Sequence, residues 1–235
     1  MLGKHPASFF IEFLFLFAFF GLLLTQLTYL IAIAETNAGT ATVLQYVCPV
    51  GVLAYTCIKD RVGPTVSEIA SMLLAIGGTF LIATHGQLNQ LAITPKGLGW
   101  GLFSAFAYAL YIILPLNLIK KWGSMLVIGV GMLLPGILML PFRGLVSFQG
   151  HYSSDNLWAL FGLIVLGTIF AYTVFLKGTS MVGAVKGSLL ASIEPISAVF
   201  FAYIIMNDQF YAIDFIGMGM ILLAVLLISL KDLII

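Results

Sequence analysis

Charged residues are scarce in this sequence. Asp, Glu, Lys and Arg make up 8% of the 235 residues, whereas a soluble globular domain carries about 25%. Hydrophobic residues make up 61%, and the mean hydropathy is +1.13. This composition is typical of a polytopic membrane protein, with the lipid bilayer as one of its partners. The net charge of +1 provides no basic surface, so we expect no nucleic-acid partner.

Cysteine and catalytic motifs are also scarce. The two cysteines, Cys48 and Cys57, fall on opposite faces of one predicted helix at about 100° per residue, so they cannot form a disulfide within it. The sequence has no HExxH, GxSxG or Walker A motif, and His5, His85 and His151 are scattered over helix ends and loops. We therefore expect no enzyme, no metal and no cofactor.

Long apolar runs are what the sequence has instead. Each is about 20 residues long, enough to cross a bilayer, and turn or charge signals separate them. The first resembles a signal peptide, but its length and Glu12 favour a helix that is retained. The predicted fold is all-α, with eight transmembrane helices at Phe9–Ala32, Asn37–Ile58, Thr65–Ala83, Leu98–Leu118, Ser124–Leu140, Leu157–Leu176, Val182–Ile205 and Ala212–Leu230.

The distribution of Lys and Arg predicts the orientation. With the N-terminus inside, only Lys96 and Arg143 of the ten basic residues lie outside. Because cytoplasmic loops are enriched in Lys and Arg, this orientation is favoured over its reverse. We expect a multi-pass protein of a bacterial plasma membrane with both termini in the cytoplasm.

The sequence also contains a diffuse repeat. A shift of 146 residues lays the first three predicted helices on the last three, and it superposes Gly21 on Gly167 and Pro49 on Pro195. The shift moves five helices along, an odd number, so the two copies have opposite orientations, as in alternating-access carriers. We predict inverted five-helix repeats: an incomplete first repeat over 1–90 with three helices, and a complete second repeat over 96–235. The first two of ten helices would then be missing, through either a misassigned start or a real truncation.

Glu194 and Pro195 lie side by side in the middle of the predicted helix Val182–Ile205. A carboxyl group at that depth is costly and is a functional-site hypothesis by default. Pro195 has no N–H group and frees backbone carbonyls one turn earlier. A solute-binding or proton-coupling carboxyl and a purely structural helix cap both remain open.

Several segments resemble the EamA-like family of the drug/metabolite transporter superfamily. They are AETNAGTATVLQYVCPV and PTVSEIASMLLAIGGTFLIA in the first half, and LGWGLFSAFAYALYII, GTSMVGAVKGSLLASIEPISAVFFAYIIMNDQF and FIGMGMILLAVLLIS in the second. The resemblance implies ten helices in two inverted repeats and the export or exchange of small metabolites. The sequence departs from the family pattern in its missing first two helices, in Cys48 at the position equivalent to Glu194, and in Ser71 where a glycine is usual.

Other polar and aromatic residues at mid-depth are candidates for lining a cavity, because polar groups that face lipid are costly. Packing is the alternative for each aromatic residue, and a simple kink is the alternative for each proline. Besides Glu194, the candidates for substrate binding or proton coupling are Gln45, Tyr46, Ser192, Gln26, Tyr108, Tyr111 and Tyr172, and those for gating are Pro49 and Pro195.

These observations predict a secondary transporter or exporter of small metabolites, such as amino acids or drug-like compounds, that works by alternating access. The alternative is a shortened, non-transporting membrane subunit or binding module of the same fold. A homo-oligomer remains open, as do the substrate, the coupling ion and the direction of transport.

Overall fold

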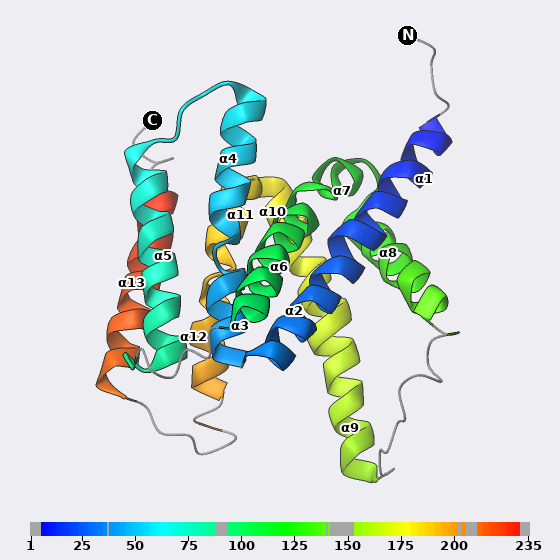
Figure 1. Cartoon of the computed structure of the whole chain (residues 1–235). Coiled ribbons are helices and arrows are strands. Elements are labelled where there is room, and N and C mark those ends of the chain that lie inside the picture. The colour runs from blue at the N-terminus through cyan, green and yellow to red at the C-terminus, as the bar shows by residue number, and fades with distance from the viewer. Residues whose placement is uncertain are drawn as a thin grey trace.

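The computed structural model describes residues 6–36, 38–87, 94–139, 141, 153–201, 204 and 211–230. Within these ranges the regular structure is helical (Figure 1). The helices are α1 (Pro6–Leu16), η1 (Phe17–Leu23), α2 (Leu24–Glu35), α3 (Ala38–Gln45), α4 (Cys48–Asp60), α5 (Val66–Thr84), α6 (Pro95–Ile113), α7 (Leu116–Trp122), α8 (Ser124–Met139), α9 (Ser154–Gly162), η4 (Leu163–Phe170), α10 (Ala171–Val182), α11 (Ala184–Leu190), α12 (Ile193–Phe201) and α13 (Ala212–Leu230).

Several of these helices are suited to a membrane. Four helical stretches are long and apolar enough to cross one: Phe10–Glu35, Thr40–Asp60, Pro95–Trp122 and Asn156–Val182. Val66–Ile82, Ser124–Met139 and Ala212–Leu227 are shorter apolar helices. The predicted helix Val182–Ile205 lies partly outside the described residues, so the count of eight stays a prediction. The chain is a multi-pass membrane protein.

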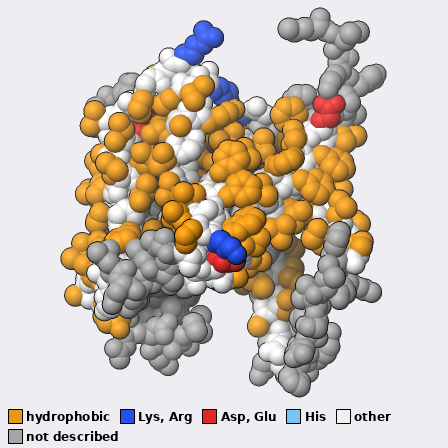
Figure 2. Space-filling view, viewed as in Figure 1, with side chains coloured by type: hydrophobic (Ala, Val, Ile, Leu, Met, Phe, Trp, Pro, Cys, Tyr) orange, Lys and Arg blue, Asp and Glu red, His pale blue; other side chains and the backbone are white. Residues whose placement is uncertain are grey.

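The outer surface has the character expected of a lipid-facing one. Large apolar side chains are widely exposed, including Val66 at 84%, Trp158 at 73% and Leu166 at 65%. Figure 2 shows hydrophobic side chains spread over most of one face, with a few charged groups among them. So much exposed apolar area is unfavourable in water and favourable in hydrocarbon.

The core is centred on α6. This helix packs against η1, α2, α3, α4 and α11, and its residues Ala107 and Ile112 are completely buried. Phe17 of η1 and Val52 of α4 are also completely buried and belong to the same cluster as Ile112. α6 therefore links the first half of the chain to the second.

Prolines break three of the predicted spans. The chain leaves regular helix at Tyr46–Val47, between α3 and α4, and at Ala191–Ser192, between α11 and α12. The first break lies just before Pro49 and the second just before Pro195, the two prolines at which the sequence predicts a kink. A proline has no N–H group to donate to the preceding turn, and its ring clashes with the carbonyl group of that turn. A third break, between α6 and α7 at Pro115, was not anticipated from the sequence.

Glycines bring α5 and α13 into backbone contact. A Cβ atom on Gly78 would lie 2.6 Å from the carbonyl oxygen of Gly217, and one on Gly217 would lie 2.8 Å from the carbonyl oxygen of Gly78. Just beyond the end of α5, Gly86 meets Ile213 of α13. Higher residue numbers in the first segment thus meet lower residue numbers in α13, so the two helices are antiparallel. They lie side by side in Figure 1.

A hydrogen bond between a histidine and a buried carboxyl group closes one end of this helix pair. The Nδ1 atom of His85, at the end of α5, lies 2.9 Å from Oδ1 of Asp214. Asp214 is completely buried, and its Oδ2 accepts a 2.9 Å hydrogen bond from the backbone N–H of Tyr211. The rings of His85 and Tyr211 also touch, with centroids 4.7 Å apart. The sequence had placed His85 among scattered histidines without a partner.

Two helical stretches, η1 and η4, have the wide turns of a π-helix. They begin at Phe17 and Leu163, which are 146 residues apart. In the second stretch, Thr168 Oγ1 donates to the carbonyl oxygen of Leu163, five residues earlier. π-helical turns are rare and occur often near functional sites. Both stretches adjoin the cavity described next.

Candidate functional site

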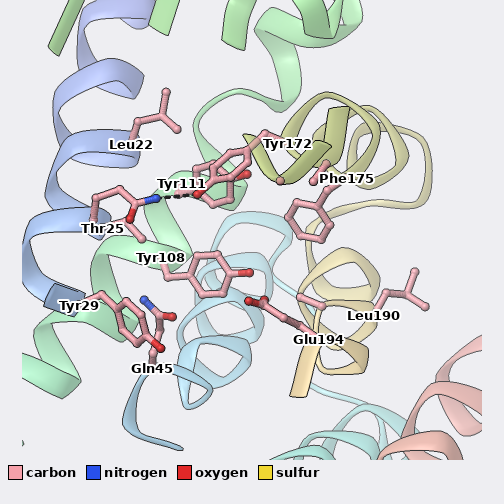
Figure 3. Close-up of a pocket in the computed structure, with 14 residues that line it drawn as sticks. Leu22, Thr25, Tyr29, Gln45, Tyr108, Tyr111, Tyr172, Phe175, Leu190 and Glu194 are labelled. Carbon is pink, nitrogen blue, oxygen red and sulfur yellow. Dashed lines mark hydrogen bonds between the residues drawn. The ribbon is translucent and has the colours of Figure 1, made fainter. Parts of the chain in front are cut away.

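A cavity of about 580 Å³ lies where the broken helices meet (Figure 3). Its volume is within the range of sites for small organic ligands. The walls come from both halves of the chain. The lining residues are Leu22 of η1; Thr25, Gln26 and Tyr29 of α2; Gln45 of α3; Tyr108 and Tyr111 of α6; Gly167 of η4; Ala171, Tyr172 and Phe175 of α10; Leu190 of α11; Ala191 after it; and Glu194 of α12.

Glu194 is the acidic residue of this cavity. It occupies the first turn of α12, immediately after the break, and its side chain is exposed. Figure 3 shows the carboxyl group directed into the cavity toward the Tyr108 ring. Its Oε2 lies 2.8 Å from the hydroxyl of Tyr46, and that hydroxyl also lies 3.0 Å from the carbonyl oxygen of Ala191. One hydroxyl group of α3–α4 thus holds both the carboxyl group and the broken backbone of α11–α12.

Aromatic rings form one wall of the cavity. Tyr108 and Tyr111 of α6 are stacked, with centroids 5.6 Å apart. Tyr172 meets Tyr111 edge-on at 5.7 Å, and Phe175 stacks on Tyr111 at 6.3 Å. Offset and edge-to-face arrangements at these distances are favourable, so the wall is pre-formed without a ligand.

The two amide side chains of the cavity are oriented by neighbouring hydroxyl groups. Gln26 donates from Nε2 to the hydroxyl of Tyr172 at 2.6 Å, drawn as a dashed line in Figure 3. Gln45 donates from Nε2 to Ser104 Oγ at 2.7 Å, and Ser104 is completely buried. Each amide group is therefore held by one N–H donor, and its carbonyl oxygen and second N–H group remain to meet a solute.

The structure brings together most of the residues singled out in the sequence. Those that line the cavity are Gln26, Gln45, Tyr108, Tyr111, Tyr172 and Glu194. Tyr46 is buried behind the wall and acts on Glu194 rather than on the space itself. Ser192 is also buried, and its Oγ has no hydrogen-bond partner within the described residues. Pro49 is buried in the first turn of α4, whereas the side chain of Pro195 lies outside the described part.

Sequence reasoning missed two aromatic lining residues, Tyr29 and Phe175. Tyr29 follows Gln26 by three residues, and Phe175 follows Tyr172 by three, so each lies on the same helix face as a residue already chosen. That spacing was the available signal. The described residues contain no group of three His, Cys, Asp or Glu side chains that could hold a metal ion.

Comparison with known proteins gives consistent matches along the chain. The model of the EamA-like transporter family matches residues 3–84 and 95–230. The uncharacterized inner membrane transporter YicL of Salmonella typhimurium is 36% identical over 219 residues, which is 93% of this chain and 73% of that protein. An uncharacterized transporter of Archaeoglobus fulgidus is 28% identical over 204 residues, 87% of this chain and 72% of its own length. A solved crystal structure with 13% identity covers 97% of this chain and 77% of its own, with a TM-score of 0.72, and so shares the fold.

Proposed function

The chain belongs to the EamA-like transporter family, and from that premise we propose that it is a secondary transporter of a small organic solute in the plasma membrane. In this proposal the solute binds in the cavity beside Glu194, and the two halves of the chain expose that cavity to each side of the membrane in turn. The main support for the proposal is that lining residues of the first half have counterparts in the second half, 146 positions later, which also line the cavity.

The cavity walls are related by the 146-residue shift. Gln26 corresponds to Tyr172 and Tyr29 to Phe175, and all four residues line the cavity. Thr25 with Ala171, and Gln45 with Ala191, are two further lining pairs at the same spacing. Related residues can touch each other only near a two-fold axis, and Gln26 is hydrogen-bonded to Tyr172. This supports a binding site on the axis between inverted repeats.

Three further features support the same division of the chain. α5 and α13 are antiparallel and occupy corresponding places in the two halves, as do the wide turns of η1 and η4. Glu68 and Asp214, also 146 apart, each accept a hydrogen bond from the backbone N–H three residues earlier. We take repeats over 1–90 and 96–235 as part of the proposal, with both termini in the cytoplasm.

The contacts of Tyr46 suggest how protonation of Glu194 would act on the backbone. The hydroxyl has one proton and two acceptors in range, Glu194 Oε2 and the Ala191 carbonyl. When Glu194 is ionised, the carboxylate competes for that proton. When Glu194 is protonated, its own O–H can donate to Tyr46, which then donates to Ala191. Proton binding would therefore change a contact at the helix break as well as the charge of the cavity.

Thiol labelling tests alternating access without knowledge of the substrate. The experiment uses Ala171→Cys in a chain whose Cys48 and Cys57 are replaced by Ala, in right-side-out and in inverted vesicles. An impermeant thiol reagent should label this position from both sides, since the cavity opens to each in turn. Leu166→Cys, on an apolar exposed face of η4, should be labelled from neither side. Labelling of Ala171→Cys from one side only would favour the alternative, a non-transporting module of the same fold.

A further inference from the structure

We infer that the cavity accepts an organic monocation, an amine carried as its ammonium ion on an apolar or aromatic body. This inference rests on the proposed function, because it assigns a substrate class to the same cavity. It starts from the charges of the lining residues. Glu194 is acidic, and none of the fourteen residues that line the cavity is Lys, Arg or His. An anionic solute would meet a carboxylate with no compensating cation, whereas a monocation would neutralise it.

The hydrogen bonds of Glu194 leave it able to bind such a cation. Within the described part of the chain, the hydroxyl of Tyr46 is its one side-chain hydrogen-bond partner. A carboxylate offers about four acceptor positions, so most of its capacity remains. An ammonium group brings three donors and no acceptor. A donor-only cation such as a charged amine therefore matches this acceptor-only group.

The other polar groups of the wall have the same character. Gln26 and Gln45 each use one amide N–H, on Tyr172 and Ser104, and their amide oxygens add two acceptors to those of Glu194. A solute rich in N–H groups at one end would find partners on both sides of the cavity.

The aromatic wall suits the rest of the same ligand. Tyr108, Tyr111, Tyr172 and Phe175 present rings within a few ångströms of one another. A ring face attracts a cation held within about 6 Å of its centroid, and it also packs against an apolar body. Figure 3 shows the hydroxyl end of Tyr108 directed toward the Glu194 carboxyl group, so one ammonium ion could contact both side chains.

Three probes of matched size test the assignment: phenethylamine, which is a cation at pH 7, the neutral 2-phenylethanol and the anionic 3-phenylpropanoate. The measurement is thermal unfolding of the purified, full chain in detergent, titrated with each probe. Above its Kd, each tenfold increase in a ligand should raise Tm by about 3–5 °C. Phenethylamine should bind at least about tenfold more tightly than the alcohol, a typical effect of one charge contact. The anion should give no shift.

The variants locate the effect. Glu194→Gln keeps the shape and removes the charge, so the preference for phenethylamine over 2-phenylethanol should fall to within about twofold. Glu12→Gln removes a carboxyl group of α1 that does not line the cavity, and the preference should persist. Equal or tighter binding of the alcohol or the anion by the unaltered chain would overturn the inference, as would binding of none of the three. The relative affinities of the three probes for the unaltered chain test the inference even if Glu194→Gln fails to fold.

The two proposals can fail separately. Labelling of Ala171→Cys from both sides, with no preference for the cation, would keep the transporter and reject the substrate class. A preference for the cation, with labelling from one side only, would leave a cation-binding module that does not transport.

Discussion

Adding one methyl group to Gly217 should destabilise the fold, whereas the same change at Gly219 should not. Both glycines lie inside α13, two residues apart. The Cβ atom of Gly217→Ala would lie 2.8 Å from the carbonyl oxygen of Gly78 and 2.8 Å from Ile82 Cγ1, closer than real Cβ contacts. The Cβ atom of Gly219→Ala would meet nothing within 4 Å. The pair of variants therefore separates the clash from every other effect of the substitution.

The magnitude follows from two opposing contributions. Replacing a helical glycine by alanine gains about 0.5–1 kcal/mol of helix stability, and both variants share this gain. Forcing a methyl group into a packed contact costs about 1–3 kcal/mol, and this cost applies to Gly217→Ala alone. The free energies of unfolding of the two variants should thus differ by about 1–3 kcal/mol. At about 2–4 °C per kcal/mol for a chain of this size, the gap in Tm is about 2–12 °C.

The assay is the fraction of detergent-solubilised protein that stays monodisperse in size-exclusion chromatography after heating. Gly217→Ala should melt below the unaltered chain or close to it, and Gly219→Ala at or above it. Equal midpoints for the two variants would mean that α5 and α13 can separate at no cost. The backbone contact would then not hold the two halves together.

Three further results are expected. Asp214→Ala leaves two hydrogen-bond partners of a buried carboxyl group unsatisfied and should lower the free energy of unfolding by about 1–3 kcal/mol. Glu68→Ala removes the corresponding, less buried carboxyl group and should lower the free energy of unfolding by about 1 kcal/mol or less. Equal losses for the two variants would show that the burial of Asp214 does not matter. Uptake of a transported amine into vesicles should be weaker in Glu194→Gln than in the unaltered chain, because the amide keeps the shape of the carboxyl group and removes its charge from the cavity; equal uptake would reduce Glu194 to a structural cap. An impermeant thiol reagent should not label Trp122→Cys in intact cells that lack the two native cysteines, because that end of α7 is assigned to the cytoplasm; labelling there would reverse the topology.

The sequence predicted the bounds of two helices closely, because lipid imposes a simple rule of length and polarity on apolar segments. Ala212–Leu230 is both the predicted and the observed helix, and α5 differs from its predicted span by one residue at each end. The breaks before Pro49 and Pro195 were also predictable, since the ring of proline acts on its own chain. The break at Pro115 was missed, because the apolar run continues through it without any change in composition.

The contacts between distant residues could not be predicted in the same way. His85 and Asp214 lie 129 positions apart, and nothing near either residue announces the other. Tyr46 is predicted to be a polar lining residue, yet its ring is buried and its hydroxyl is hydrogen-bonded to Glu194. Sequence periodicity indicates which face of a helix a residue occupies. It does not indicate which other helix packs against that face, because this depends on how all the helices pack together.

The wide turns of η1 and η4 also have a bearing on ancestry. A π-helical turn holds one residue more than an α-helical turn, so a single-residue insertion in a straight helix is its simplest origin. The two stretches begin at corresponding places in the proposed repeats. One insertion in a common precursor explains both wide turns, whereas two later insertions would have had to occur independently at the same position of each half. If the proposed repeats arose by gene duplication, the widened turn is older than that duplication and offers a fixed point for aligning the two halves of distant relatives.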